Sequence, residues 1–454
     1  MKNLLIISIG LMLIIACCYL SKDNSNTTNQ DHGNIIYAAS GSRDDIQAAV
    51  DSASDGDTIL IPEGTFNFGS GYVEILDKLI HIKGAGMDRT ILEETTGDSA
   101  KSDGMFRFIM LYKTGGPIVS DMKLHDINGP YSESNTENTT VGISLHWGCS
   151  DFQIYNMEFE GFGGAGVMTD EYGGPYDYQW KTKGVIYKCR FIDNFMPGLG
   201  YGVEVYGGDD KSYSEPIHLG TDYAVFVEDC YFEGNRHHIA SGHGSRYVFR
   251  YNTCLSNEGG SAIDVHGVVY GSEGTRGSIS SEIYGNIIEG NPEQSGIGIR
   301  GGMGVIHNNT FKDRLMGIIF DVQGCRQGEI GYPCEYPVKD QIYDLYIWNN
   351  TFINCPYNLF IHEDYIETDL LQENRDYFLY EKPGYTPYIY PHPLRWRNFP
   401  LNAEINASFS SRWRSLTVFR IATSNFFHIF RQRLPIPYSC ILNIFPFIPL
   451  YIGN

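Results

Sequence analysis

Short segments in which apolar and polar residues alternate recur along most of the chain, as expected of β-strands. Seven of them align on an aliphatic anchor: Ile143, Val167, Val203, Ile239, Ile263, Ile297 and Ile318. Because side chains alternate between the two faces of a strand, each anchor and the residue two positions later point into a core. The residues one and three positions later then point outward. The pattern predicts seven strands that share one register.

A second phrase, an aromatic or aliphatic residue near Asn, recurs between these segments. It ends at Phe159, Phe191, Phe232, Leu255, Ile288, Phe311 and Phe352. Asn286, Asn309 and Asn350 occupy one position of the phrase, where we expect their side chains to stack inward on consecutive turns. Cys189 and Cys230 occupy the same column, which favours buried thiols over reactive ones. Variable spacing with constant register predicts a solenoid with insertions.

The first folded segment has the pattern of a helix followed by a strand. In "SRDDIQAAVDSASDGDTILIPEGTF" (42–66), Ser42 can cap a helix. The apolar stripe of that helix comprises Ile46, Ala49, Val50 and Ala53. The phrase "TILIPEGTF" then predicts a strand.

This segment and "LIHIKGAGMDRTIL" (79–92) resemble the N-terminal cap and first rungs of the pectate lyase-like superfamily. The resemblance implies an all-β protein, a single right-handed parallel β-helix over 35–393 with an N-terminal capping helix and long loops on one edge. A helix placed end-on would cover the core of the first rung, which a solenoid otherwise exposes.

The outward positions form a predicted polar stripe. Three positions after the anchors stand His146, Asp170, Tyr206, Gly242, His266, Arg300 and Asp321. One position after them stand Ser144, Glu204 and Asp264, and His238 directly precedes its anchor on the same predicted face. Rungs stack about 4.8 Å apart, so we expect Asp264, His266 and Arg300 to be near neighbours. The alternative is that Asp264–His266 and Arg300–Asp321 are mutually satisfied surface pairs.

Long insertions follow four of these strands and predict a wall beside the stripe. They cover 171–183, 207–222, 268–280 and about 323–343. A wall beside a polar face makes a groove. Aromatic side chains in the insertions suit the faces of sugar rings; they are Tyr172, Tyr176, Tyr178, Trp180, Tyr213 and Tyr270.

Composition narrows the class of ligand that the protein could bind. The formal net charge of −21 argues against nucleic acid, which requires a basic surface. The resemblance implies a polysaccharide instead, because this superfamily cleaves uronate polymers by β-elimination or hydrolysis. We favour a lyase acting on an acidic glycan. Bound Ca²⁺ would reconcile an acidic protein with an acidic substrate.

β-Elimination needs a group that neutralises the uronate carboxylate and a base for the adjacent proton. Arg300 is a candidate for the clamp or, as Arg does in pectate lyases, for the base. His266 or His238 is the more ordinary base, and Asp264 completes the predicted catalytic group. The predicted Ca²⁺ ligands are Asp170, Glu204 and Asp321. The predicted substrate-binding residues are His146, Tyr206, Arg236, His243, Tyr172, Trp180 and Tyr270.

Other classes of function remain open. A non-catalytic glycan-binding or cell-surface adhesive solenoid would use the same groove without turnover. "SGHGS" (241–245) resembles the Gly-His-Gly of polygalacturonases and would make His243 a catalytic helper of a glycoside hydrolase, but that family's Asn-Thr-Asp and paired-Asp segments are not found in register. "RHHIASGH" (236–243) also invites a transition-metal site with Asp264 and His266.

The N-terminus predicts export. Residues 1–17 have a secretory signal pattern, and "IIAC" resembles a lipobox that would lipidate Cys17. Residues 18–34 read as a polar tether. We therefore expect a secreted or cell-surface monomer. The alternatives left open are attachment to a membrane through the lipid on Cys17, an uncleaved signal anchor, and an ordinary signal peptide without attachment. Cys325 and Cys334 are close enough in one loop for a disulfide, or are two free thiols.

The C-terminal end changes character. "NRDYFLYEKPGYTPYIYPHPL" (374–394) predicts a strap that closes the solenoid. From Arg395 the chain has 7 Arg, no Lys and one acid, Glu404. The segment 394–454 is too interrupted by Pro for a membrane helix. It is either a membrane-seeking or partner-binding tail or the product of an altered reading frame, and we assign it no function.

Overall fold

The computed structural model describes most of the chain between residues 33 and 397. The described ranges are 33–95, 105–112, 115–131, 139–146, 148–169, 182–207, 218–267, 277–290, 292–322, 336–337, 340–363, 366 and 369–397. They belong to the first of two compact units, Met1–Pro400; the second is Leu401–Asn454.

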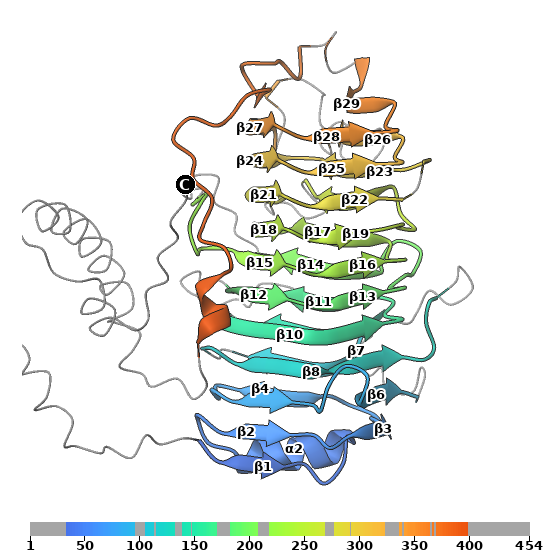
Figure 1. Cartoon of the computed structure of the whole chain (residues 1–454), viewed down its shortest axis with the longest axis vertical. Helices are drawn as coiled ribbons and strands as arrows, with labels where there is room; N and C mark the ends of the chain where they lie inside the picture. The colour runs from blue at the N-terminus through green and yellow to red at the C-terminus, as the bar shows by residue number, and fades with distance from the viewer. Residues whose placement is uncertain are drawn as a thin grey trace, which may run out of the picture. The chain divides into compact units, whose positions relative to one another are not determined.

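In the described part of the chain, the strands form a 20-stranded and a 10-stranded parallel sheet along a stack of coils (Figure 1). The larger one has two parts, which we call the first and second sheets, and the 10-stranded one is the third sheet. The first contains β1 (Ile35–Tyr37), β2 (Thr58–Leu60), β5 (His81–Lys83), β8 (Ile118–Asp126), β10 (Ser150–Glu160), β12 (Lys183–Tyr187), β15 (Val225–Glu228), β18 (Arg246–Arg250), β21 (Ser280–Tyr284), β24 (Gly302–His307), β27 (Ile342–Trp348) and β30 (Tyr377–Phe378). The second contains β3 (Gly64–Asn67), β6 (Thr90–Glu94), β13 (Arg190–Ile192), β16 (Tyr231–Glu233), β19 (Thr253–Cys254), β22 (Ile287–Glu289), β25 (Thr310–Lys312) and β28 (Thr351–Ile353), and the long strands β8 and β10 run through both sheets. The third contains β4 (Val73–Leu76), β7 (Met105–Tyr112), β9 (Thr139–His146), β11 (Ala165–Thr169), β14 (Tyr201–Tyr206), β17 (His237–Gly242), β20 (Ser261–Val265), β23 (Ser295–Ile299), β26 (Met316–Phe320) and β29 (Tyr357–Ile361). Each coil contributes one segment to each sheet in turn, as a β-helix requires.

The predicted register of the third sheet is confirmed. Ile143 pairs with Val167, and the pairing continues rung by rung to Ile318. The seven anchors are completely buried. A register shared by six successive strand pairs places the outward residues of distant sequence segments side by side.

The predicted Asn column lies at the corner between the first and second sheets. Asn286 donates from Nδ2 to Oδ1 of Asn309 at 2.9 Å, and Asn309 donates to Asn350 at 3.0 Å. The thiols of Cys189 and Cys230 are buried as predicted, and burial raises the pKa of Cys230. Such a ladder satisfies backbone groups that the turn would otherwise leave unpaired inside the protein.

One position of the aromatic column was predicted wrongly. Phe159, Phe191 and Phe232 stack as expected, with ring centroids 5.0 and 4.8 Å apart. On the next rung Cys254, not Leu255, pairs with Phe232. The segment that matches the other phrases is "RYNTC" (250–254), one residue earlier than "YNTCL", and Asn252 then falls in the Asn column, where its Nδ2 donates to Asn286 Oδ1 at 3.1 Å.

The capping helix is confirmed as α2 (Arg43–Ser52). Ser42 is its N-cap, and its hydroxyl accepts a hydrogen bond from the Asp45 backbone N–H at 3.3 Å. Ile46, Ala49 and Val50 are buried in the same core as the first coils. The apolar stripe of the helix therefore shields the end of the solenoid.

Residues 379–397, which we call the strap, run back along the outer face of the first sheet and end with a short 3-10 helix, η4 (Pro393–Trp396) (Figure 1). Lys382 pairs with Asp344 of β27 at 2.7 Å, and Arg397 pairs with Asp151 of β10 at 3.3 Å. The predicted strap thus exists, but it crosses the coils rather than closing the end of the stack. Leu394 is buried, so the folded body extends past residue 393. In the described part of the chain, no helix has the length and apolarity to cross a membrane.

Candidate functional site

The polar stripe lies on the outer face of the third sheet, as its register predicts. Tyr206 pairs with Gly242, and backbone hydrogen bonds continue the ladder one residue beyond the later strands. The backbone N–H of His266 donates to the Ser241 carbonyl at 3.1 Å. In the same way Arg300 donates to the Val265 carbonyl and Asp321 to the Ile299 carbonyl, both at 2.9 Å. His266 and Arg300 therefore occupy matched positions on adjacent rungs.

Asp264 and Arg300 form the ion pair at the centre of the stripe. Arg300 Nε lies 3.0 Å from Asp264 Oδ1, and the Asp264 side chain is almost completely buried. Burial alone would raise the pKa of the Asp264 carboxyl, but the Arg300 guanidinium holds that pKa below its usual range. The carboxylate stays ionised and fixes one edge of the guanidinium.

His237 is the member of this cluster that sequence reasoning missed. Its ring stacks on Tyr201 at 5.8 Å, its Nδ1 lies 2.5 Å from the Ser261 carbonyl oxygen, and its Nε2 lies 3.8 Å from Asp264 Oδ2. No described residue makes a hydrogen bond to this Nε2. Burial lowers the pKa of His237 to about 4, although Asp264 acts in the opposite direction. A neutral imidazole whose Nδ1–H donates to Ser261 therefore faces a carboxylate with its lone pair.

The predicted outward position of His238 is wrong. Its imidazole is completely buried, with Nδ1 3.2 Å from Asn235 Nδ2 and Nε2 3.0 Å from the Leu255 carbonyl oxygen. The strand bends at its start, so both His238 and the anchor Ile239 face the interior. The signal was present in the sequence: the other rungs carry small residues here, namely Gly142, Gly166, Gly202, Ala262, Gly296 and Gly317. At Gly202 an added Cβ would come within 2.9 Å of the Phe232 ring, which shows that the column points inward.

The predicted substrate-binding residues among the described ones lie on or beside the stripe. The Tyr206 and His243 rings meet edge-to-face at 4.6 Å, and Arg236 donates to the Tyr201 hydroxyl at 3.2 Å. His146 stacks on Tyr112 at 5.1 Å, toward the N-terminal end of the stripe. Tyr172, Trp180 and Tyr270 lie outside the described residues, as do Cys325 and Cys334.

The predicted calcium ligands do not form one site. Glu204 belongs to β14 and Asp321 follows β26, four rungs away in the third sheet. Four rungs span about 19 Å, whereas Ca²⁺ ligands lie about 2.3–2.6 Å from the ion. Asp170 lies outside the described residues, and among the described residues no three His, Cys, Asp or Glu side chains are grouped as metal ligands. Glu204 and Asp321, the two described members of the predicted set, are therefore too far apart to hold one ion together.

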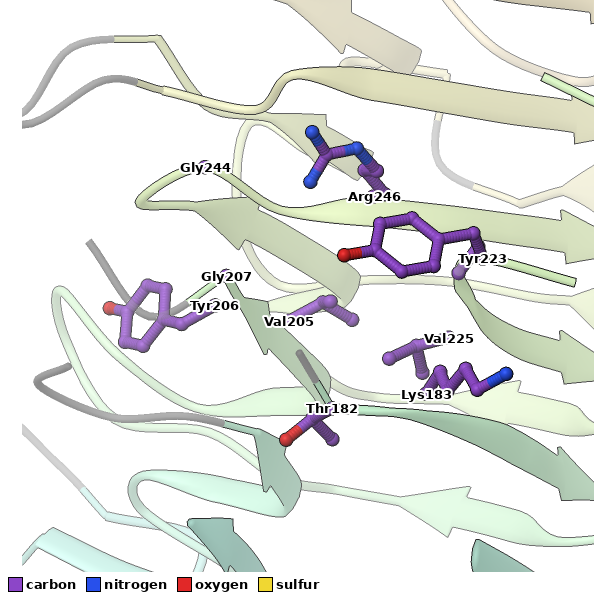
Figure 2. A pocket seen from close by; sticks show the side chains of 10 residues that line it. Thr182, Lys183, Val205, Tyr206, Gly207, Tyr223, Val225, Gly244 and Arg246 are labelled. Atoms are coloured by element: carbon purple, nitrogen blue, oxygen red, sulfur yellow. The ribbon is translucent and has the colours of Figure 1, made fainter. Parts of the chain in front are cut away.

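A pocket lies at the corner where the third sheet passes into the first (Figure 2). The residues that contribute to its walls include Tyr206 at the end of β14, Thr182 and Lys183 where β12 begins, Tyr223 before β15, and Arg246 at the start of β18. Arg246 was not predicted as a site residue, because it belongs to the first sheet and has no place in the stripe's repeat.

Several histidines are buried in the neutral form, and we expect them to make the stability of the fold sensitive to acid. Burial lowers the pKa of His81, His237 and His307 to about 4, and that of His238 to about 3. Between pH 6.5 and 4 the unfolded chain binds protons that the folded one excludes, so stability is complete above pH 6.5 and falls below it. We expect the urea midpoint of unfolding to drop from pH 7 to pH 5.

The matched variants are His238→Gln and, at an exposed position, His362→Gln. The first should lower the midpoint at pH 7 and reduce its fall on acidification. The second should reproduce the wild-type pH profile. A midpoint that stays constant between pH 7 and pH 5 would contradict the burial of neutral imidazoles.

Comparison with known proteins shows similarity of fold to solved structures. The sequence matches no protein-family model and none of the curated proteins compared with it. Similar solved structures include an alginate lyase from Paenibacillus sp. str. FPU-7, with 15% identity, a TM-score of 0.46 and coverage of 72% of this chain and 98% of the lyase. Another is the catalytic unit of an α-1,3-glucanase from Streptomyces thermodiastaticus strain HF3-3, with 13% identity, a TM-score of 0.41 and coverage of 74% and 64%. A third is the A-module of a mannuronan C-5 epimerase from Azotobacter vinelandii, with 15% identity, a TM-score of 0.35 and coverage of 71% and 87%.

These identities and scores concern the course of the backbone and carry no activity over to this chain. The strand order and register of the structure itself give the same architecture. The chain has a right-handed parallel β-helix fold.

Proposed function

We propose that the chain binds an acidic polysaccharide along the polar stripe and cleaves it by β-elimination. The observation that supports this most is the placement of an arginine and a histidine, Arg300 and His266, on adjacent rungs of one outer face. The buried Asp264 carboxylate orients the arginine from below. A cation and an imidazole about one rung apart are the two groups that elimination from a uronate requires.

In this mechanism Arg300 binds the uronate carboxylate. Its charge stabilises the negative charge that develops when the proton on the neighbouring ring carbon is removed. His266 takes that proton, and the electrons of the broken C–H bond form the ring double bond. The glycosidic oxygen leaves with the electrons of the C–O bond and takes a proton from water. His266 Nδ1 lies 3.0 Å from the Gly267 carbonyl oxygen, so Nδ1 carries the proton of the neutral imidazole and Nε2 is the basic nitrogen in this proposal.

Asp264 holds Arg300 rather than acting on substrate, because its side chain is almost completely buried. His237, equally buried, lies behind Asp264. Both are positioning residues in this proposal. The depressed pKa of Asp264 keeps its charge at neutral pH, so the orientation of the guanidinium does not depend on protonation in that range.

Incubation with a panel of uronic-acid polymers, alginate and polygalacturonate among them, tests the proposal. We expect the ultraviolet absorbance of an unsaturated uronate and new reducing ends to appear together, with and without chelator. Reducing ends without the absorbance would discard the lyase in favour of a hydrolase. A signal that disappears with chelator would show that a metal is required after all.

A glycan-binding protein without turnover is the second candidate. It is favoured by the ion pair itself, since Asp264 neutralises part of the Arg300 charge in the resting protein. Binding of a polymer without either product would support it. Neither binding nor cleavage of any polymer in the panel would remove both proposals.

A further inference from the structure

His237, Asp264 and Arg300 form a row of three titratable side chains on adjacent rungs of the third sheet. His237 Nε2 lies 3.8 Å from Asp264 Oδ2, and the other oxygen of that carboxylate lies 3.0 Å from Arg300 Nε. Exposure increases along the row, because His237 is 1% exposed, Asp264 is 3% exposed and the Arg300 side chain is 14% exposed. Asp264 therefore stands between a buried imidazole and the guanidinium that is proposed to bind the uronate.

The imidazole of His237 is neutral in the resting protein, and Nε2 is its acceptor nitrogen. Nδ1 lies 2.5 Å from the Ser261 carbonyl oxygen, so Nδ1 carries the proton. Nε2 has no hydrogen-bond partner among the described residues. Burial lowers the pKa of His237 to about 4, which keeps a second proton away at neutral pH. A proton on Nε2 would turn the contact with Asp264 into an ion pair.

Several charged and titratable groups surround His237. The two arginines among them repel a proton on the imidazole, whereas Asp264 attracts one. Burial raises the pKa of Tyr201, whose ring stacks on His237, and lowers the pKa of His238 to about 3, so both stay uncharged near neutral pH. The full set is Tyr201 and Glu204 of β14, Arg236 before β17, His238 of β17, Asp264 of β20 and Arg300 after β23.

A uronate carboxylate at Arg300 changes the balance of charge in this row. It adds a negative charge beside the guanidinium and shares the donors that compensate Asp264. A buried carboxylate that loses its compensation is strongly unfavourable. His237 is placed to replace the lost charge, because a proton on Nε2 makes an imidazolium that faces Asp264 directly.

We propose that binding of a uronate carboxylate at Arg300 is coupled to uptake of a proton from solvent by His237, whose imidazolium then pairs with Asp264. This inference rests on the proposed function for the carboxylate at Arg300, and it adds regulation of that site by pH. Coupling between two sites is reciprocal, so acid that protonates His237 also strengthens uronate binding. Acid has the opposite effect on turnover, because His266 must be neutral to act as the base.

Calorimetric binding of galacturonate and mannuronate tetramers to the full chain tests the coupling. The chain carries His266→Gln, which prevents cleavage and removes another imidazole that acts on Asp264. The bound anion raises the pKa of His237, so we expect Kd to fall by about tenfold from pH 7 to pH 5. At pH 5, buffers of different ionisation enthalpy should give different binding enthalpies, equivalent to uptake of about one proton per tetramer.

The control variants are made in the same His266→Gln chain. His237→Gln should abolish both the pH dependence of Kd and the proton uptake, and Asp264→Asn should abolish them as well. His362→Gln, at an exposed position, should leave both unchanged. Since the first two positions are buried, NMR of the histidine side-chain nitrogens gives a reading that needs neither variant. An imidazole protonated only on Nδ1 should become protonated on both nitrogens when the tetramer binds at pH 5.

The outcomes separate the coupling from the proposed function. An equal Kd at pH 7 and pH 5, or a pH dependence that persists in a folded His237→Gln chain, would overturn the coupling alone. Proton-coupled binding without cleavage of any polymer by the wild-type chain would overturn the lyase alone. Absence of binding of both tetramers at each pH would overturn the coupling together with the proposed site.

Discussion

Replacement of Arg300 by Gln is expected to lower turnover of the cleaved uronate polymer by about 10²–10³-fold. The amide keeps much of the side-chain volume but removes the charge that stabilises the deprotonated uronate. Arg300→Lys should recover part of the loss, because it keeps the charge without the planar pair of donors. The measurement is the initial rate of unsaturated product formation, with kcat and KM determined separately.

Arg190→Gln is the matched control for this prediction. Arg190 lies on the second sheet, half exposed, and pairs with Glu158 at 2.9 Å. It should show wild-type turnover. Undiminished turnover in a folded Arg300→Gln would remove the arginine from the mechanism. Thermal unfolding of both variants separates this outcome from a loss of fold, since Arg300→Gln also leaves the buried Asp264 without its ion pair.

Replacement of Arg250 by Met is expected to destabilise the protein by about 3–5 kcal/mol. Arg250 is completely buried, and its Nη2 lies 2.6 Å from Glu228 Oε2. It also donates to the strap carbonyls of Tyr388 and Ile389, at 2.7 and 3.0 Å. The substitution leaves a buried carboxylate short of one cation and two carbonyls without donors. Urea unfolding gives the change in free energy.

The control is Arg89→Met, which removes an exposed ion pair with Glu63, 3.1 Å in length. It should cost less than about 1 kcal/mol. Limited proteolysis adds a local reading: the strap should become cleavable in Arg250→Met and remain protected in Arg89→Met. Equal stability of the two variants would show that the buried cluster contributes no more than a surface pair.

The repeat is what made the fold predictable. A strand has a period of two, so one correctly chosen anchor, such as Ile263, fixes the face of every residue near it. Constant register across the insertions then places Asp264 and Arg300 on neighbouring rungs without any coordinate. The Asn column was equally predictable, because Asn286, Asn309 and Asn350 recur at one position of the repeat, where each side chain forms a hydrogen bond with the next.

Departures from the repeat were not predictable in the same way. Strict alternation assigned His238 outward, whereas the bend at the start of the strand turns it into the core. Burial of His237 next to Asp264 followed from that bend. Glu204 and Asp321 share a face, but their separation depends on the number of rungs between them rather than on the pattern within each rung.

Contacts of the first sheet with the strap and with the corner pocket leave no periodic pattern in the sequence. Arg250 and the strap carbonyls are 138 and 139 residues apart in sequence. Arg246 reaches the corner pocket from the first sheet, and the alignment that predicted the stripe covers only strands of the third sheet. Such pairs follow from the path of a non-repeating segment, and only the folded chain reveals it.

The strap changes how the solenoid can come apart. In a simple stack each coil touches only its two neighbours, so an end coil can fray while the rest stay folded. Here one segment is tied to Asp344 of β27, Glu282 of β21, Arg250 of β18, Glu228 of β15 and Asp151 of β10. Opening one of these coils loosens the ties that the others share. The strap therefore couples coils that are not neighbours in the stack and makes their unfolding more cooperative.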